Sequence, residues 1–219
     1  MNFLMLYFFA YIPATFCPVK SETVLGTTNL PLPEGGTLIG LNYQIRDDNN
    51  QYKEVHAFLG IPFAHAPVGD LRFSPPKPIE PEYFSGLVNA TKLPNSCWQY
   101  LPGKFDKSNP GARIWVNNTE MSEDCLYLNV WKPADKATAS ASNLPVMVWI
   151  FGGGFFSGTA TLDVYNGLQL AARENVIVVS MQYRLGAFGF LYLGSGQRTY
   201  PTAANGNMGL LDQQLALKW

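Results

Sequence analysis

Two apolar runs, separated by a glycine-rich loop and a helix-like segment, constrain the fold of this chain more than any other feature. The first run covers residues 144–150 and the second covers residues 175–181, and each is typical of a buried strand. Residues 162–174, which lie between them, have a helix-like pattern. Because a crossover helix lets the two strands run in the same direction, this order predicts a parallel sheet in an α/β fold.

A glycine triplet at residues 152–154 follows the first strand directly. Since glycine has no Cβ, the backbone N–H groups of such a loop lie open to a substrate carbonyl at the C-terminal edge of the sheet. Preorganised N–H donors of this kind form an oxyanion hole, which stabilises the negative oxygen of an acyl-transfer transition state. Glycine triplets also occur in plain loops and hairpins, so the triplet alone leaves both interpretations open.

The segments around this unit are predicted from their patterns. Residues 37–63 contain short alternating stretches that favour antiparallel strands, and residues 126–131 predict a further strand. Residues 85–120 have little periodicity and many Pro, Asn and Gly residues, which is typical of a long irregular loop.

The last residues predict a closing helix. Residues 205–207 supply caps, and Leu211, Leu215 and Trp219 share one face of the helix because they are spaced four residues apart. No glycine, proline or polar tail follows Trp219, so we expect the chain to be the N-terminal part of a larger protein whose C-terminal part is missing here.

The composition is that of a globular protein, and the first residues predict secretion. Of the 219 residues, 47% are hydrophobic and 14% are charged, and the formal net charge is −1. This balance allows a sizeable core and argues against nucleic acid or an anionic membrane as a partner. Residues 3–12 are an apolar run that is too short to span a bilayer. They predict a signal peptide over residues 1–20 and therefore secretion.

The cysteines and two short motifs agree with an oxidising compartment. Cys17 lies at the edge of the expected signal peptide, which leaves Cys97 and Cys125 as a natural disulfide pair. The alternative is two buried free thiols. Asn89 and Asn117 each begin an Asn-x-Thr triplet, so both are glycosylation acceptors if the chain is secreted, although such triplets are common by chance.

Six ordered blocks of this sequence resemble the type-B carboxylesterase/cholinesterase family. The blocks are FLGIPFA at residues 58–64, GDLRF at 69–73, SEDCLYLNVW at 122–131, the glycine loop, YRLGAFGF at 183–190 and GNMGLLDQQ at 206–214. The resemblance implies the α/β-hydrolase fold, a mostly parallel sheet with helices on both faces, with antiparallel strands at the N-terminus. Residues 21–219 would then be the N-terminal portion of one such domain.

The resemblance implies a mechanism in which a Ser-His-Glu triad attacks an ester carbonyl and three backbone N–H groups hold the oxyanion. It assigns two of these donors to Gly153 and Gly154. The third donor, the nucleophile in its G-x-S-x-G turn and the other triad members would follow Trp219, so we expect the 219-residue chain to be inactive alone. No cofactor and no metal is implied.

Four aromatic residues are assigned to the substrate site by the same resemblance. Trp115 would stack on a quaternary ammonium group, a role that suits indole. Tyr165 would support this site from behind, and Phe156 and Tyr100 would line the approach to it. The alternatives are that Trp115 packs inside its loop and that Tyr165 is an ordinary core residue.

Two ion pairs are also implied by the resemblance, Arg72 with Glu123 and Arg184 with Asp212. Both are expected to be buried and to join segments that are far apart in the sequence, so their expected role is structural.

The resemblance therefore implies an extracellular serine esterase whose substrates are small choline esters. Two alternatives stay open from the sequence: a catalytically inactive adhesion protein of the same family, and a carboxylesterase of broader range. Oligomer formation and a membrane anchor, at the cell surface or the synapse, would depend on the part of the protein after Trp219.

Overall fold

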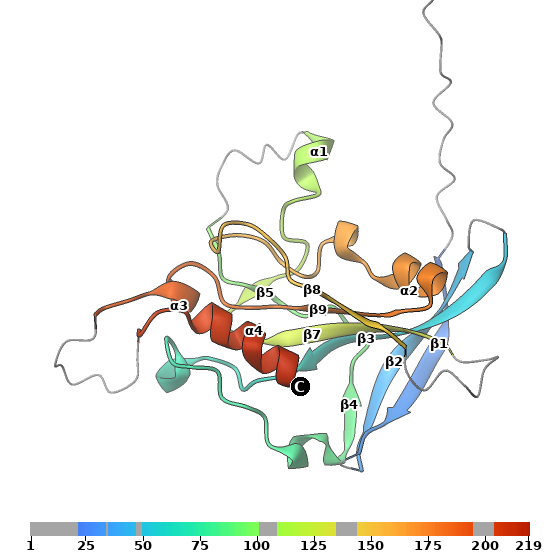
Figure 1. The fold of residues 1–219 in the computed structure, drawn as a ribbon, viewed down its shortest axis with the longest axis horizontal. Coiled ribbons are helices and arrows are strands. Elements are labelled where there is room, and N and C mark those ends of the chain that lie inside the picture. Colours follow the sequence, from blue (N-terminus) through green and yellow to red (C-terminus); the bar gives the residue numbers. More distant parts are fainter. Residues whose placement is uncertain (1–21, 34, 47–49, 101–108, 135–143, 195–203) are drawn as a thin grey trace, which may run out of the picture.

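A computed structural model of the chain describes residues 22–33, 35–46, 50–100, 109–134, 144–194 and 204–219 (Figure 1). The expected signal peptide over residues 1–20, including Cys17, lies outside these residues. Among the described residues, no helix is both long and apolar enough to cross a membrane.

A seven-stranded mixed sheet forms the centre of the molecule, with strand order β1-β2-β3-β7-β9-β8 and with β4 beside β2. Its strands are β1 (Glu22–Pro31), β2 (Thr37–Arg46), β3 (Tyr52–Pro62), β4 (Leu87–Asn89), β7 (Tyr127–Pro133), β8 (Val146–Trp149) and β9 (Ile177–Met181). The strands on either side of the glycine loop, β8 and β9, pair in parallel, as predicted. The described sheet is otherwise mostly antiparallel, because the N-terminal strands supply most of it.

The pattern over residues 37–63 is confirmed as an antiparallel pair, β2 with β3. Strand β1, which the sequence analysis did not predict, extends this ribbon at the edge of the sheet. The described part of residues 85–120, which leaves out 101–108, contains only short elements, as expected for an irregular region. These are β4, the strand β5 (Ser96–Cys97), which pairs with β6 (Met121–Ser122), and the single-turn helix α1 (Pro110–Arg113).

Helices cover both faces of the sheet. Helix α2 (Leu168–Glu174) packs on one face against Val55, Trp131 and Val178, while α4 (Met208–Lys218) places Ala216 in the cluster on the other face. Figure 1 shows α2 and α4 on opposite sides of β7 and β9. Successive side chains of a strand point to opposite faces, so the central strands are apolar on both sides. A third helix, α3 (Gly186–Phe190), packs against α4.

The helical segments differ in detail from their predicted form. Residues 162–174 divide into a 3-10 turn, Asp163–Tyr165, and α2; further 3-10 turns lie at Gly69–Leu71 and Pro81–Ser85. In α4 the buried face carries Met208, Asp212 and Ala216, whereas Trp219 is exposed. Asp212 lies on this face because it pairs with the buried Arg184.

Strand β8 was expected to be buried, and this is wrong for the described residues. The side chains of its four residues, Val146–Trp149, are all exposed. The reason is its position at the edge of the sheet, where β9 is the one described strand that pairs with it. Its apolar sequence therefore indicates a strand but not the number of its neighbours.

Candidate functional site

The glycine loop leaves β8 in a tight turn that requires glycine. Gly153 has a φ of 138° and Gly154 a φ of 61°, both in the left-handed half of the map that L side chains rarely adopt. The Gly153 carbonyl accepts hydrogen bonds of 3.2 Å from the backbone N–H groups of Phe156 and Ser157. A Cβ on Gly153 would lie only 1.9 Å from the Ser157 carbonyl oxygen, so the turn cannot close around a larger residue.

The residues after β9 hold the glycine loop from one side. The Tyr183 hydroxyl donates a hydrogen bond of 2.7 Å to the Phe151 carbonyl, and the two rings stack with their centroids 4.4 Å apart. The Gly186 N–H donates to the Phe155 carbonyl at 2.8 Å. Both ends of the triplet are therefore fixed to the buried end of the sheet.

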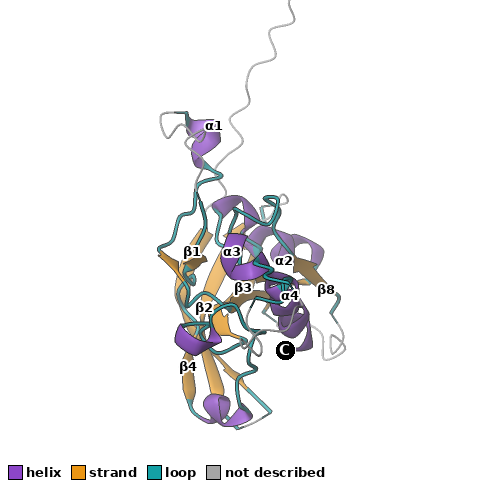
Figure 2. Ribbon diagram, turned by 90° about the vertical axis from the view of Figure 1, so that its left-hand side faces the viewer, coloured by secondary structure: helices purple, strands orange, loops and turns teal. Residues whose placement is uncertain are grey.

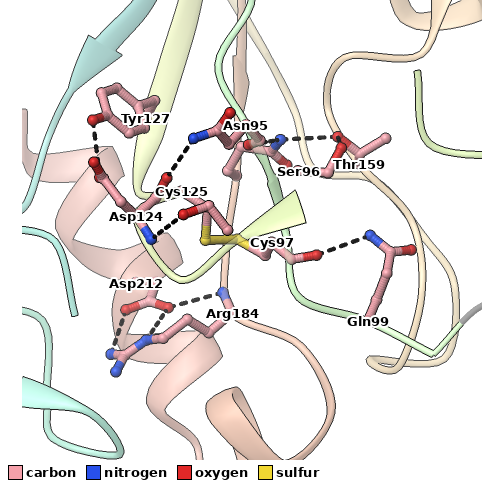
Figure 3. The surroundings of a disulfide bond; sticks show 12 residues. Asn95, Ser96, Cys97, Gln99, Asp124, Cys125, Tyr127, Thr159, Arg184 and Asp212 are labelled. Carbon is pink, nitrogen blue, oxygen red and sulfur yellow. Dashed lines mark hydrogen bonds and ion pairs between the residues drawn. A yellow bond between two sulfur atoms is a disulfide. The ribbon is translucent and has the colours of Figure 1, made fainter. Parts of the chain in front are cut away.

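Gln99 holds the far end of the same loop. Its side-chain amide donates to the Gly158 carbonyl and accepts from the Gly158 N–H, both at 2.8 Å. The same amide nitrogen also donates to the Cys97 carbonyl at 3.1 Å, a bond that Figure 3 draws beside the disulfide. The start of the disulfide loop and the end of the glycine loop are thus joined through one side chain.

The backbone donors of the triplet stay unused within the described part of the chain. None of those residues accepts a hydrogen bond from the N–H of Gly153 or of Gly154. Unpaired backbone donors are uncommon in folded proteins unless water or a ligand meets them. Two consecutive N–H groups of this kind can bind a developing negative charge.

A cleft of about 380 Å³ opens beside the glycine loop. Its lining residues are Trp115, Gly152, Gly153, Ser157, Gly158, Leu162 and Tyr165. None of these described lining residues carries a charged side chain. Two of the lining residues, Trp115 and Tyr165, are aromatic, and their ring centroids are 6.4 Å apart. The ring of Tyr165 also lies 5.0 Å, between centroids, from the ring of Trp149.

Trp115 is placed by the short helix α1. Asn109 caps this helix by accepting a hydrogen bond of 2.9 Å from the Gly111 N–H, and proline occupies the first turn, where its missing N–H costs nothing. The backbone N–H of Trp115 then donates to the Ala112 carbonyl. Figures 1 and 2 show α1 standing apart from the other helices. The Trp115 side chain is 46% exposed, so it is not packed inside its loop.

Tyr165 is half-buried at the end of a 3-10 turn. Burial raises the pKa of its hydroxyl above the usual value, so this group stays neutral near pH 7. It can therefore support the Trp115 ring without adding charge to the cleft.

The other predicted site residues do not line this cleft. Gly154 comes directly after the lining residue Gly153 but is not itself part of the lining. The Phe156 residue is exposed, and its ring lies close to Gly154. Tyr100 is 76% exposed, and the residues after it lie outside the described part of the chain. The structure thus brings together Gly153, Trp115 and Tyr165 but leaves Phe156 and Tyr100 on the surface nearby.

The disulfide between Cys97 and Cys125 is confirmed, with a Cα–Cα distance of 5.1 Å and both residues buried (Figure 3). Free thiols at these positions are therefore excluded. The bond closes the loop that carries Trp115, and it lies close to the glycine loop through Gln99.

The two ion pairs differ in their burial. Arg184 donates to Asp212 from Nε at 2.9 Å, from Nη2 at 2.8 Å and from its backbone N–H at 3.0 Å, and both side chains are almost fully buried (Figure 3). Arg72 and Glu123 form a two-pronged pair of 2.5 and 2.6 Å, but the Arg72 side chain is 42% exposed. The expectation that this second pair is buried is wrong, because Arg72 follows a 3-10 turn at the surface.

The two glycosylation triplets lie in different settings. Asn89 is exposed, and its side-chain oxygen accepts hydrogen bonds from the N–H and the hydroxyl of Thr91. The Asn117 amide nitrogen, in contrast, donates to the Thr119 carbonyl at 2.9 Å and is half-buried.

Sequence reasoning missed several polar residues around the cleft. Gln99, Asn118, Thr159, Thr161 and Gln182 all make hydrogen bonds there. One signal was available: Gln182 directly follows the apolar strand β9, and a buried amide needs partners. The partners themselves could not be read from the pattern.

Comparison with known proteins gives one consistent family. A sequence profile of the carboxylesterase family matches residues 24–219. The chain is 52% identical to the acetylcholinesterase of Leptinotarsa decemlineata over 182 residues, which is 76% of this chain and 27% of that protein. It is 44% identical to the acetylcholinesterase of Electrophorus electricus over 223 aligned positions, which is 99% of this chain and 30% of that protein.

A third relative gives a similar result. The chain is 52% identical to acetylcholinesterase 4 of Caenorhabditis briggsae over 167 residues, covering 76% of this chain and 25% of that protein. The chain thus spans between 25% and 30% of the length of these relatives. The profile match, the relatives and the sheet, which is consistent with the N-terminal portion of the α/β-hydrolase fold, agree: the chain belongs to the carboxylesterase family.

Proposed function

We propose that this chain is the N-terminal part of a secreted serine esterase that hydrolyses choline esters. The observation that carries the proposal is the cleft that places Trp115 and Tyr165 beside Gly153. The similarity to three acetylcholinesterases supports it.

The glycine loop supplies electrostatic stabilisation of the reaction. The N–H groups of Gly153 and Gly154 hold the carbonyl oxygen as it gains negative charge, and removal of one such donor typically raises the barrier by about 2.7–4 kcal/mol. Tyr183 stacks on Phe151 and donates a hydrogen bond to its carbonyl, and these contacts keep the N–H donors in place before substrate binds.

Trp115 supplies the binding of the cationic end. A quaternary ammonium group over the face of an indole gains about 0.5–2 kcal/mol, and more when water is excluded. Since none of the lining residues that the structure describes is charged, the aromatic rings of Trp115 and Tyr165 provide the attraction there.

The nucleophile is proposed to lie outside this chain. No serine among the 219 residues has glycine both two positions before it and two positions after it. Ser157 lines the cleft, but its hydroxyl donates to the Gly153 carbonyl at 3.3 Å and sits within the glycine loop rather than on a strand-to-helix turn. We therefore propose that the serine, its His and Glu partners and the third oxyanion donor follow Trp219, and that the 219-residue chain alone hydrolyses no ester.

An inactive binding protein of the same family is the second candidate, because the 219 residues contain no G-x-S-x-G turn that would distinguish it from the esterase. The coding sequence after Trp219 decides between the two. A glycine-flanked serine soon after the end of α4 supports the esterase, and its replacement by another residue supports the binding protein.

The extracellular location and further partners belong to the same proposal. Residues 1–20 act as a signal peptide, and the disulfide suits an oxidising compartment. Asn89 is the more accessible of the two glycan acceptors, because it is exposed and Asn117 is half-buried. Oligomer contacts and any membrane anchor are assigned to the part of the protein after Trp219.

The experiment compares two tryptophans of the disulfide loop in the full-length secreted protein. Trp115 and Trp98 are equally exposed, at 46% and 45%, but only Trp115 lines the cleft. Trp115→Ala is expected to lower kcat/KM for a choline ester by about 2- to 30-fold. Hydrolysis of an uncharged ester with carbon in place of the ammonium nitrogen should change far less, and Trp98→Ala should affect neither ester.

Other outcomes would contradict the proposal. An equal loss for both esters would indicate a general carboxylesterase, in which Trp115 does not recognise charge. Absence of hydrolysis by the unmodified full-length protein would indicate the binding protein.

A further inference from the structure

A network of uncharged polar side chains lies behind the cleft and joins the loop of Trp115 to the end of the glycine loop. Its members are Ser96, Asn118, Thr119, Thr159, Thr161 and Gln182. Four of them, Ser96, Thr159, Thr161 and Gln182, are buried to 2% exposure or less. None of the six lines the cleft itself.

Hydroxyl groups form the centre of the network. The Ser96 hydroxyl lies 2.8 Å from that of Thr119 and donates to that of Thr159 at 3.0 Å. The Thr159 and Thr161 hydroxyls are 2.8 Å apart. Figure 3 shows Ser96 and Thr159 next to the disulfide. These hydrogen-bonded hydroxyls therefore connect Ser96 and Thr119, which lie near the two ends of the disulfide loop, to Thr159 and Thr161, which follow the glycine loop.

Gln182 connects the hydroxyls to the sheet. Its amide nitrogen donates to the Thr159 hydroxyl at 2.8 Å and to the Asn95 carbonyl at 2.9 Å, and its amide oxygen accepts from the Ala160 N–H at 3.1 Å. This residue directly follows β9, which makes the end of a core strand the fixed point of the network.

Asn118 connects the other end to the Trp115 loop. Its side-chain oxygen accepts from the Thr161 hydroxyl at 2.7 Å, and its nitrogen donates to the Thr161 carbonyl at 2.7 Å and to Asp163 at 3.2 Å. Asn118 follows Trp115 by three residues, and Thr161 precedes Tyr165 by four. The paired amide and threonine thus join the segment of Trp115 to the segment of Tyr165.

We propose that Thr161 and Asn118 are positioning residues that determine the preference for cationic esters without touching the substrate. This inference rests on the proposed function and deepens it. Asn118 itself is exposed, but it bonds to the buried part of the network at Thr161. A hydrogen-bonded network with a buried centre resists distortion, so it holds the Trp115 ring at a fixed place relative to Tyr165 and Gly153. Loss of the Thr161 hydroxyl leaves the Asn118 side-chain oxygen without its donor, and the disulfide loop then samples positions in which Trp115 no longer meets the ammonium group.

The test uses Thr161→Val, which keeps the shape of the side chain and removes its hydroxyl. In the full-length secreted protein we expect the ratio of kcat/KM for a choline ester over an uncharged isostere to fall about tenfold, mainly through KM. Thr161→Ser retains the hydroxyl and should restore the ratio to within about twofold.

The matched control is Ser180→Ala. Ser180 is also fully buried, and its hydroxyl accepts a hydrogen bond of 3.1 Å from Asn129, but it belongs to the pairing of β7 with β9 and not to the network. Its loss should lower thermal stability while leaving the ratio of the two esters unchanged. An equal fall of the ratio in both variants would overturn the proposal, because the effect would then be general destabilisation.

A second measurement is independent of catalysis. Hydrogen exchange of the backbone amides at residues 115–120 should accelerate at least about tenfold in Thr161→Val and stay unchanged in Ser180→Ala. If the unmodified protein hydrolyses no ester but exchange at these amides accelerates in Thr161→Val, the proposed function fails, while the positioning of the Trp115 loop by Thr161 is supported. If neither the ester ratio nor the exchange responds, the positioning role is refuted. Should Thr161→Val not be secreted, Asn118→Ala breaks the hydrogen bond between these two residues from the loop side, together with the Asn118 bonds to the Thr161 carbonyl and Asp163, and is judged by the same two measurements.

Discussion

The hydroxyl of Tyr183 donates a hydrogen bond of 2.7 Å to the carbonyl oxygen of Phe151, and the two rings stack with centroids 4.4 Å apart. Tyr183 stands just after β9, whereas Phe151 is the residue before the glycine triplet. Both side chains are buried, at 1% and 2% exposure. The position of the glycine loop therefore depends on a buried polar contact with the core of the sheet.

Tyr183→Phe should destabilise the protein with little change in shape. The variant keeps the stacked ring but leaves the buried Phe151 carbonyl without its donor, so we expect the free energy of unfolding to fall by about 1–3 kcal/mol. Urea unfolding of the secreted full-length protein at pH 7 measures this. An unchanged unfolding midpoint would mean that water replaces the hydroxyl at this carbonyl.

The same variant isolates the contribution of the Tyr183 hydroxyl to the loss of stability at alkaline pH. Burial raises the pKa of Tyr183 to about 12, above its usual value of 10.0. Between these two values the unfolded chain loses the proton and the folded protein keeps it. The stabilisation is therefore complete below pH 10 and is lost as the pH rises toward 12. The stability difference between the native protein and Tyr183→Phe should shrink over this window; a constant difference would contradict the assignment.

The two arginine pairs should respond very differently to alanine. Arg184→Ala leaves Asp212 buried without a partner, so a loss of about 3–5 kcal/mol and failure of secretion are expected. Arg72→Ala removes a pair whose guanidinium is 42% exposed and screened by water, so secretion and melting temperature should stay near those of the native protein. Immunoblotting of the medium and thermal melting measure both. Normal secretion of Arg184→Ala would refute the structural role of the pair.

The sequence indicates the central strands well because their apolar runs are long enough to be recognised without knowledge of their neighbours. Strand β8 was identified, but its exposure was not predicted, since burial depends on which elements lie beside a strand at the sheet edge. For the same reason the burial of Arg72 was misjudged: pairing with Glu123 followed from the resemblance, whereas exposure follows from the local course of the chain.

The candidate site was only partly accessible from the sequence. Gly153, Trp115 and Tyr165 stand at positions that the family resemblance marks, and the structure brings them to one cleft. Gln99 and Thr161 carry no such mark. Their roles depend on hydrogen bonds to residues 59 and 43 positions away in the sequence, and neither propensity nor periodicity reports contacts of that range.

Removal of the disulfide should weaken the whole fold. The bond closes a loop of 28 residues, for which the chain-entropy account gives about 3.5 kcal/mol of stabilisation. The double variant Cys97→Ala/Cys125→Ala should therefore be secreted poorly and melt at a lower temperature. Cys17→Ala is the control, because the signal peptide prediction places this residue at the edge of the removed segment. An effect of Cys17→Ala on the melting of the secreted protein would contradict that prediction.

Two neighbouring glycines give the sharpest test of the glycine loop. A Cβ on Gly153 would lie 1.9 Å from the Ser157 carbonyl oxygen, whereas a Cβ on Gly152 would meet no atom within 4 Å. Gly153→Ala must therefore shift the turn and displace its N–H donors, and kcat of the full-length protein should fall about 10²–10³-fold. Gly152→Ala should melt at the native temperature, which shows that an added methyl group does not by itself unfold the loop. Gly153→Ala that folds normally and keeps kcat within about tenfold would exclude this N–H as an oxyanion donor, because a displaced donor cannot stabilise the transition state to that extent.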